Sequence, residues 1–173
     1  MADELLDQVD KNDKVIGTVW KSQAHGNPDI IHREIAFVVF NKNGEVLLQQ
    51  RSAKKTNDPL GWKLTAAGHV GKGEDPKIAA SRELKEELGV EAEPIYFNKV
   101  FISQQEYNES RFFYVYYSLL DNSPRLVIDE NEVEDAKWVK IEKLDDFAKT
   151  NNYDSNGWSH KTIIEIAKYI KLI

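Results

Sequence analysis

The sequence predicts a single α+β domain in which strands and helices share one hydrophobic core. The chain has 173 residues, which is enough for one ordinary domain and short for two. Hydrophobic residues make up 41% of the chain and charged residues 30%, a balance typical of globular proteins. Strand-like and helix-like segments follow one another without a repeat, a low-complexity tract or a linker. We therefore expect one domain over residues 1–173.

The first part of the chain is predicted to be mostly β-strand. Two short strand-like runs flank a turn at residues 10–13, and a polar loop follows at residues 22–29. The clearest signal is a hairpin in which Asn43 and Gly44 join two strands. These two strands are expected at residues 35–40 and 46–50.

Residues 62–70 are expected to form one further short strand, which leads into the strongest predicted helix. Asp75 suits the N-cap position of this helix and Pro76 suits its first turn. Gly89 is expected to end the helix. Its core-facing stripe consists of apolar residues four positions apart, namely Ala80, Leu84 and Leu88.

The rest of the chain predicts three strands and two helices. The strands are expected at residues 95–103, 111–120 and 135–141, with a connecting loop at 104–110. The helices are expected at residues 143–150 and 159–173.

Charge and cysteine content exclude several classes of function. The net charge is −6, which disfavours non-specific binding of nucleic acid because such binding needs clustered lysine and arginine. The chain has no cysteine, so it has neither disulfides nor a cysteine nucleophile. Residues 1–10 are acidic and lack the apolar core of a signal peptide. No apolar run approaches the roughly 18 residues that a membrane span needs. We expect a cytoplasmic protein that does not contact membranes.

Three glutamates share one face of the predicted helix. Glu83, Glu86 and Glu87 are three and four positions apart, which places their side chains on the same side. At about 100° per residue, their mean direction lies roughly 110° from the apolar stripe, so they are expected to face an open groove. Like charges at this spacing destabilise a helix by about a few tenths of a kcal/mol per pair. A solvated acidic surface is the simplest interpretation of such a helix, and only the wider sequence pattern argues against it.

That wider pattern covers residues 68–90. It consists of Gly, five residues, Glu, seven residues and then Arg-Glu-aliphatic-x-Glu-Glu-x-Gly-aliphatic. The constrained positions are filled by Gly68, Glu74, Arg82, Glu83, Leu84, Glu86, Glu87, Gly89 and Val90. The segment resembles the Nudix box, and the match is complete.

The resemblance to the Nudix family implies an α/β/α sandwich around a mixed β-sheet. The box, residues 68–90, would form a loop, a helix and a second loop. Residues 1–30 would be an N-terminal extension of strand and loop, and residues 142–173 would be C-terminal helices. Most proteins of this family hydrolyse a diphosphate bond in a nucleoside diphosphate that is linked to another group.

The resemblance also implies a metal site. Glu83, Glu86 and Glu87 would be its carboxylate ligands, and the backbone at Ala67 and Gly68 would lie close to the ion. Hard oxygen ligands of this kind suit Mg²⁺ or Mn²⁺, which bridge carboxylates to phosphate oxygens. A cation would explain why the protein crowds these acids together.

Further roles follow from the same resemblance. Arg82 and Glu74 would form a structural ion pair that holds the first loop of the box against its helix. The catalytic base often lies outside the box, on a loop before a late strand, which here offers Glu130, Glu132 and Glu134. We expect Glu132 to be the base, with Glu83 as the alternative inside the box.

Substrate-binding residues are expected next to the box. Arg51 follows the second hairpin strand, close to where the family places its substrate, and Lys54 lies in the following loop. His69 lies inside the box and is expected near the site. The expected partner is a small nucleotide or diphosphate, without nucleic acid, and a homodimer is compatible with this prediction.

A second branch of the family offers a rival interpretation. Residues 9–25 and residues 32–52 resemble type I isopentenyl-diphosphate isomerases and their hydrolase relatives. Those isomerases bind a metal through histidines, and His25, His32 and His69 match these places. They also use a cysteine where this chain has Ala67, and a pair of glutamates on a strand after the box. Residues 111–117 contain no acid, and the nearest is Glu109.

We therefore predict an enzyme, a Mg²⁺- or Mn²⁺-dependent Nudix pyrophosphohydrolase that acts on a nucleotide or related diphosphate. An isomerase is disfavoured because the cysteine is missing. A binding module that has lost turnover is the third hypothesis, and it would lead us to expect a degraded set of box carboxylates. None of the box glutamates is missing here.

Overall fold

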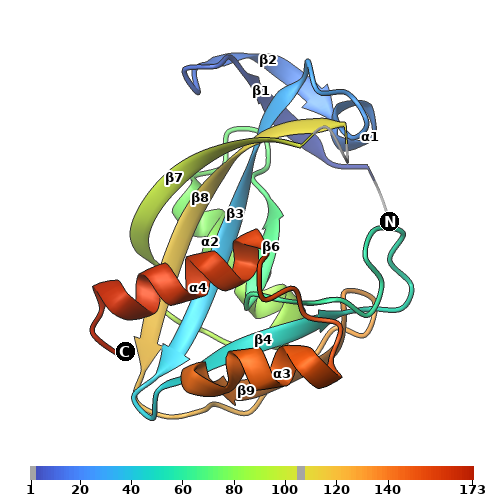
Figure 1. Cartoon of the computed structure of the whole chain (residues 1–173). Coiled ribbons are helices and arrows are strands. Elements are labelled where there is room, and N and C mark those ends of the chain that lie inside the picture. The colour runs from blue at the N-terminus through green and yellow to red at the C-terminus, as the bar shows by residue number, and fades with distance from the viewer. Residues whose placement is uncertain (1–2, 105–107) are drawn as a thin grey trace.

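The computed structural model describes residues 3–104 and 108–173. Figure 1 shows a twisted sheet with helices on both faces and a smaller β-unit at one end. In chain order the elements are β1 (Leu5–Val9), β2 (Val15–Trp20), α1 (Lys21–Ala24), β3 (Ile31–Asn41), β4 (Glu45–Arg51), β5 (Trp62–Lys63), β6 (Ala66–His69), α2 (Pro76–Leu88), β7 (Ile95–Gln104), β8 (Glu109–Leu120), β9 (Val133–Lys140), a 3₁₀ turn (Ile141–Lys143), α3 (Leu144–Thr150) and α4 (Trp158–Tyr169).

Strand β3 is the centre of the sheet. Along one edge it pairs in parallel with β8 over its whole length. Along its other edge it pairs in an antiparallel manner with β1 at its start, with β6 in its middle and with β4 at its end. The strands β2, β7 and β9 extend the sheet by pairing with β1, β8 and β4 respectively. The sheet is therefore mixed, as the sequence predicts.

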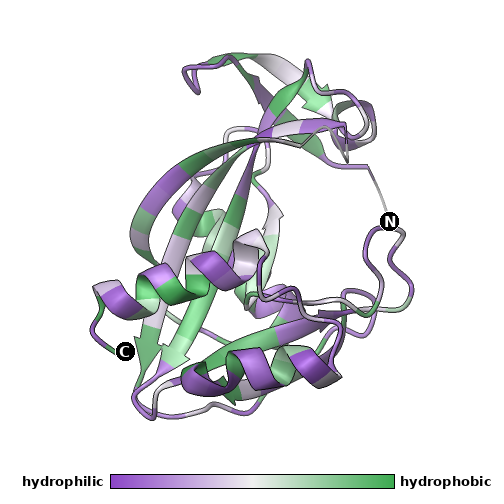
Figure 2. Ribbon diagram, viewed as in Figure 1, coloured by the Kyte–Doolittle hydropathy of each residue, from purple (hydrophilic) through white to green (hydrophobic). Residues whose placement is uncertain are grey.

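The side chains of β3 alternate between two cores. Ile35, Phe37 and Val39 pack against one face with the buried apolar residues of α2. The intervening residues pack on the other face with residues of α3 and α4, because successive side chains of a strand point to opposite sides. In Figure 2 the central strands are strongly hydrophobic, whereas the helices carry hydrophilic residues on their outer sides. This arrangement confirms the predicted α/β/α sandwich.

Helix α2 forms where the sequence predicts it. The side chain of Asp75 accepts a hydrogen bond of 2.8 Å from the backbone N–H of Lys77, which caps the first turn. Gly89 ends the helix with a φ of 66°, and its N–H donates to the carbonyl of Lys85. Leu84 and Leu88 are fully buried. The cap and the glycine thus fix where α2 begins and ends, and the apolar stripe fixes which side of it faces the sheet.

The predicted strand at residues 62–70 is two strands instead of one. β5 pairs with β4, whereas β6 pairs with β3. Thr65 lies between them, and its hydroxyl donates to the carbonyl of Leu47 and accepts from the N–H of Val39. The Thr65 side chain therefore bridges β3 and β4 at the point where the backbone passes from β5 to β6.

Smaller differences occur at several element boundaries. The short helix α1 overlaps the start of the predicted loop at 22–29. The predicted loop at 104–110 is shorter than expected, because β7 extends to Gln104 and β8 begins at Glu109, and its residues 105–107 lie outside the described residues. The last helix ends at Tyr169, before the predicted end, since Lys171 adopts a φ of 60°. No helix in the part of the chain that the structure describes is long and apolar enough to cross a membrane.

The end of α2 generates a stability prediction. A Cβ at Gly89 would lie 2.7 Å from the Cβ of Val127, whereas one at Gly44, which also has a positive φ, would meet nothing within 4 Å. We expect Gly44→Ala to lower the free energy of unfolding by about 1–2 kcal/mol through backbone strain. Gly89→Ala should cost about 1–3 kcal/mol more, because Val127 must also move. Urea unfolding of both variants measures this, and equal losses would contradict the steric argument.

Candidate active site

The three box glutamates of α2 differ sharply in exposure. The side chain of Glu86 is 58% exposed, that of Glu83 is 14% exposed, and Glu87 as a residue is only 6% exposed. Glu87 lies about 60° around the helix from Leu84, whereas Glu86 lies about 160° away. The prediction that all three face an open groove is therefore wrong for Glu87. Its carboxylate is turned toward β4 and accepts a hydrogen bond of 3.0 Å from the side-chain N–H of Gln49.

Arg82 fixes the geometry around these carboxylates. Its Nε lies 2.9 Å from one carboxylate oxygen of Glu74 and its Nη2 lies 3.0 Å from the other. Nη2 also donates to the backbone carbonyl of His69, and Nη1 donates to Glu83 at 2.7 Å. The structure thus contains the expected Arg82–Glu74 pair, which ties the first loop of the box to its helix.

Gly68 provides the space for Glu83. A Cβ at residue 68 would fall 2.1–2.5 Å from the atoms of the Glu83 carboxyl group. Only a residue without a side chain lets this carboxylate approach the backbone of β6 so closely. Ala67, the other expected backbone ligand, precedes it on β6 and is exposed.

Burial and like charge make this group of acids electrostatically unfavourable without a cation. Burial raises the pKa of Glu83 to about 6, despite the opposing effect of Arg82. Burial and the neighbouring Glu83 raise the pKa of Glu87 well above its usual range. A divalent ion would relieve both effects, and the donors are all oxygen atoms. The residues therefore fit Mg²⁺ or Mn²⁺.

Of the three candidate bases outside the box, Glu132 acts most directly on it. Its charge contributes to the raised pKa of Glu87, and its carboxylate forms an ion pair with Lys55. Glu134 instead accepts a hydrogen bond from the backbone N–H of Ala53. Only Glu132 therefore combines an electrostatic effect on the box with a carboxylate that is held by a side chain.

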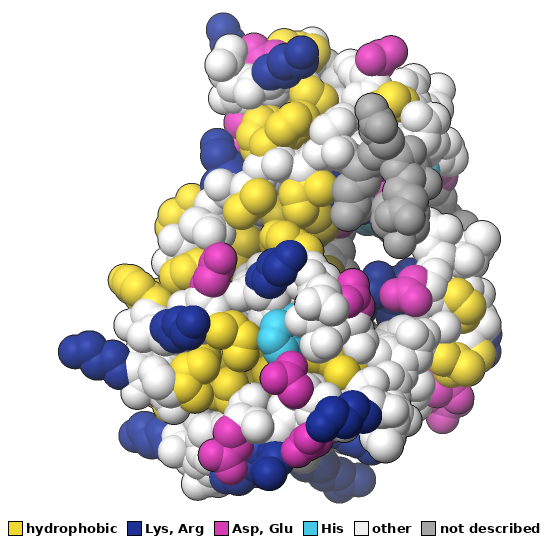
Figure 3. All heavy atoms as spheres, viewed as in Figure 1, with side chains coloured by type: hydrophobic (Ala, Val, Ile, Leu, Met, Phe, Trp, Pro, Cys, Tyr) yellow, Lys and Arg dark blue, Asp and Glu magenta, His cyan; other side chains and the backbone are white. Residues whose placement is uncertain are grey.

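The predicted substrate-binding residues divide into two groups. The charge of Arg51 lowers the pKa of Glu87, and its Nε donates to the backbone carbonyl of Asn57 at 3.0 Å. Lys54 does not reach the box carboxylates and donates to the side chain of Asn131 at 3.2 Å instead. Lys63, which was not predicted from the sequence, lies opposite Gln49 in the β4–β5 pair and forms an ion pair with Asp58 at 3.3 Å. Figure 3 shows an opening in the middle of the molecule with basic and acidic side chains at its lower rim.

A second cluster of polar residues lies beside the first. Donor atoms of His25, His32, Glu34 and His69 all lie within 4.8 Å of one another. The Nε2 atoms of His25 and His69 are 2.9 Å apart, and that of His32 lies 3.2 Å from a carboxylate oxygen of Glu34. This convergence suits one metal ion, and three imidazoles with one carboxylate are a donor set that transition metals favour.

The surroundings of the histidine cluster support that interpretation. Burial lowers the pKa of His69 to about 4, which keeps its imidazole in the neutral form that binds metals. Glu109 lies 3.1 Å from Nδ1 of His25, on the far side of the ring from the cluster. Arg111 contacts both Glu34 and Glu109. Outer contacts of this kind orient metal ligands.

His69 joins the two groups of residues. It was expected to bind substrate, yet its ring lies in the histidine cluster while its backbone carbonyl accepts from Arg82. Glu34, a member of the cluster, was not predicted from the sequence. The available signal was its position two residues after His32, which places both side chains on one side of β3.

The geometry agrees with comparisons to known proteins. A family model described as the NUDIX domain matches residues 31–159. The chain belongs to the Nudix family. Membership agrees with the sequence-based prediction of an enzyme that hydrolyses phosphoanhydride bonds.

Curated relatives of this Nudix protein are named isopentenyl-diphosphate Delta-isomerases. One from Photorhabdus laumondii is 34% identical over 82% of this chain and 80% of its own length. One from Serratia proteamaculans is 30% identical over 90% of this chain and 87% of its own length. One from Streptomyces avermitilis is 44% identical, but the match covers only 50% of this chain and 44% of that protein. The chain thus matches less than half the length of the Streptomyces relative.

Solved structures similar to this Nudix protein share its fold at low sequence identity. A Deinococcus radiodurans protein gives a TM-score of 0.67 at 24% identity, covering 86% of this chain and 91% of that one. The NUDIX domain of Shewanella oneidensis NrtR, complexed with ADP ribose, gives 0.62 at 20% identity, with coverages of 80% and 87%. An Ap4A hydrolase of Caenorhabditis elegans gives 0.59 at 23% identity, with coverages of 82% and 98%.

The tight space at Gly68 generates a prediction about metal affinity. In Gly68→Ala the new methyl group would displace the Glu83 carboxylate, which is the free end of a flexible side chain. We expect little change in unfolding free energy and a loss of Mn²⁺ affinity of about 10-fold or more. Gly17→Ala is the control, because its Cβ would meet only an atom 3.6 Å away. Calorimetric titration measures both, and unchanged affinity in Gly68→Ala would count against Glu83 as a ligand.

The histidine cluster generates a separate prediction. We expect protein that is loaded with Co²⁺ or Zn²⁺ and then dialysed to retain one tightly bound ion per chain, and His25→Ala to lose it. His160→Ala is the matched control, because His160 contacts Tyr153 outside the cluster and should leave retention unchanged. Elemental analysis by mass spectrometry measures the retained metal. Equal retention by wild type and His25→Ala would exclude the cluster as the binding site.

Proposed function

We propose that the protein is a Mg²⁺- or Mn²⁺-dependent Nudix pyrophosphohydrolase that cleaves the diphosphate bond of a nucleotide or of a nucleoside diphosphate linked to another group. The observation that carries this proposal is the convergence of Glu83, Glu86 and Glu87 beside Gly68. These acids are crowded, partly buried and only partly neutralised by Arg82. Such a group is stable in the folded protein when a divalent cation binds it.

Each side chain of the site has a task in this proposal. Glu83, Glu86 and Glu87 hold the cation, which supplies neutralisation of phosphate oxygens and a lower pKa for bound water. Arg82 keeps Glu83 in place through its contact at 2.7 Å and holds the loop that carries Glu74. Gln49 orients the carboxylate of Glu87 by donating to it. Glu132 accepts the proton of the attacking water.

The substrate class rests on the basic side of the site and on relatives. The positive charge of Arg51 acts on Glu87, and we assign this side chain to a substrate phosphate. Proteins of the same fold are described with ADP ribose and as an Ap4A hydrolase, and we extend the nucleotide class to this chain. Lys54 is not retained in this proposal because it points to Asn131.

Isomerisation of isopentenyl diphosphate is the second candidate function, favoured by the names of the relatives and by the histidine cluster. Against it, Ala67 stands where the resemblance implies a cysteine. Strand β8 offers Glu109 followed by Arg111, and not the expected pair of glutamates. A non-catalytic binding module is disfavoured because every box glutamate is retained. We therefore place hydrolysis first.

The remaining expectations are part of the same proposal. Residues 1–173 would form one Nudix domain, in which residues 1–30 add a unit of strands and loop that contributes His25 to the histidine cluster. The partner would be a small-molecule nucleotide or diphosphate in the cytoplasm, with no nucleic acid or membrane, and a homodimer is compatible with it. The absence of cysteine and the acidic net charge of −6 support these expectations.

A substrate panel tests the proposed reaction. Nucleoside diphosphates, dinucleotides and nucleotide sugars are incubated with Mg²⁺, and phosphate is measured after phosphatase coupling. We expect at least one to be cleaved, and Glu86→Gln or Glu87→Gln to reduce kcat by about 100-fold or more, since both changes keep shape and remove charge. Glu91→Gln is the control, because Glu91 pairs with Lys85 at an exposed position.

Two outcomes would contradict the proposal, the first for the catalytic site and the second for the reaction. Release of phosphate that Glu86→Gln and Glu87→Gln leave unchanged would exclude the box as the catalytic site. Conversion of isopentenyl diphosphate to its isomer, without phosphate release, would support the second candidate function.

A further inference from the structure

The loop after β4 and the loop before β9 are joined by a row of contacts beside the box. The backbone N–H of Ser52 donates to the carbonyl of Glu132 at 3.0 Å, and its hydroxyl donates to the carbonyl of Glu130 at 2.9 Å. The N–H of Ala53 donates to the carboxylate of Glu134. These contacts fix the backbone around Glu132 and leave its side chain to be placed by another group.

That group is Lys55. Its ammonium forms an ion pair with the carboxylate of Glu132, and the two side chains are only 17% and 26% exposed. The backbone N–H of Lys55 donates to the carbonyl of Ser52, so the turn that carries the lysine is itself held. A comparable pair at the surface, Lys42 with Asp121, is 64% and 77% exposed. Partial burial and a fixed backbone make the Lys55 pair less screened by solvent.

The charges around Glu132 explain why such a partner is needed. The N–H of Asp129 donates to the carbonyl of Glu87, which holds the loop against the end of α2. The adjacent Val133 is fully buried in the core under α2. Glu132 is thereby placed where its charge and that of Glu87 repel each other. Without an opposite charge its carboxylate would be expected to turn toward solvent.

We propose that Lys55 is a positioning residue, whose ammonium holds the Glu132 carboxylate at the edge of the box glutamates in the orientation from which it accepts a proton. This inference rests on the proposed function, in which Glu132 is the base. It assigns to Lys55 an effect that passes through Glu132. Direct binding of a substrate phosphate by Lys55 is the competing role, and the two roles make different predictions for a double variant.

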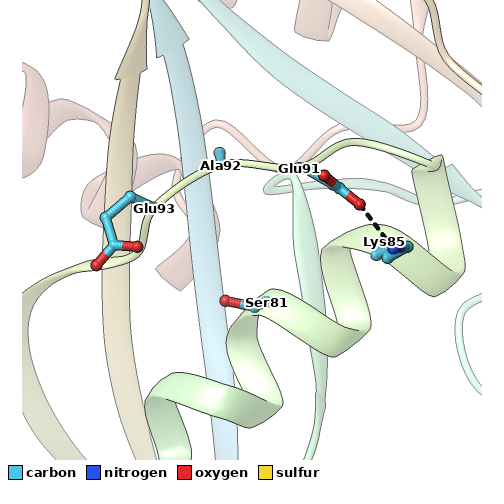
Figure 4. Close-up of a pocket in the computed structure, with 5 residues that line it drawn as sticks. All are labelled: Ser81, Lys85, Glu91, Ala92 and Glu93. Carbon is cyan, nitrogen blue, oxygen red and sulfur yellow. Dashed lines mark hydrogen bonds and ion pairs between the residues drawn. The ribbon is translucent and has the colours of Figure 1, made fainter.

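The pocket beside α2 does not support a proposal of comparable weight. The shallow pocket in Figure 4 is lined by Ser81, Lys85, Glu91, Ala92 and Glu93. The first two of these residues lie on the side of α2 opposite Glu83 and Glu87, and Lys85 is already paired with Glu91 at 2.6 Å.

A double-mutant cycle tests the proposal with the full chain, Mg²⁺ and the best substrate of the panel. The variants are Lys55→Met, Glu132→Gln and the two combined, with Lys42→Met as the matched control in an exposed ion pair. We expect Glu132→Gln to lower kcat by about 100-fold. Lys55→Met should lower kcat by about 10-fold with a smaller change in KM, and Lys55→Arg should restore most of the loss. The double variant should be no slower than Glu132→Gln alone, because Lys55 has no further target.

The alternative outcomes are distinct. Independent losses in kcat/KM that multiply in the double variant, with KM raised by Lys55→Met, would overturn the proposal and assign Lys55 to the substrate. Wild-type kcat in Glu132→Gln would remove Glu132 as the base, and with it the proposed role of Lys55, while hydrolysis itself would stand. No hydrolysis of any substrate by the wild type would overturn the proposed function. Urea unfolding of the same four proteins would then still show whether Lys55 and Glu132 are coupled, and additive effects there would exclude the pair itself.

Discussion

The contacts of one guanidinium group hold the candidate site together. Arg82 reaches Glu74 in the first loop of the box, Glu83 and Glu86 on α2, and the backbone carbonyl of His69 at the end of β6. A loop, a helix and a strand are thereby joined at one side chain. The planar fork of arginine can make these contacts at once, whereas the single ammonium of lysine cannot. The ring of His69 also belongs to the histidine cluster. The contact between Arg82 and His69 therefore connects the two candidate metal sites.

The two sites have donor sets of different chemistry. The box offers carboxylates, which suit magnesium or manganese, and the cluster around His32 offers imidazoles, which suit transition metals such as zinc. The local electrostatics reinforce this difference. Glu34 keeps its negative charge, because hydrogen bonding by His32 and the charge of Arg111 outweigh burial and lower its pKa. Glu83 and Glu87, in contrast, have raised pKa values, because burial outweighs the effect of their protein partners. Glu34 is thus paired with a cationic side chain of the protein, Arg111, whereas the box acids need an external metal cation.

The sequence predicts what depends on local spacing and fails where distant strands meet. Helix α2 could be predicted from Asp75, Gly89 and the leucine stripe, because caps and periodicity are local properties. The two strands within residues 62–70 could not, since their separation depends on Thr65 bonding to β3 and β4 together. The burial of the box acids also could not be predicted from local spacing. Spacing put three glutamates on one side of a helix, but only the sheet beside α2 decides that Glu87 is buried against Gln49.

Contacts between two loops also give different partners to lysines that are adjacent in the chain. Lys54 and Lys55 are equivalent as sequence signals, and both follow the strand that carries Arg51. In the structure Lys54 ends at the neutral side chain of Asn131, whereas Lys55 ends at the carboxylate of Glu132. The difference arises because the loop before β9 presents Asn131 and Glu132 to two successive lysines. Charge placement in this site is therefore set by the register between two loops. A shift of one residue in either loop would leave the box intact but would move the Lys55 ammonium away from Glu132.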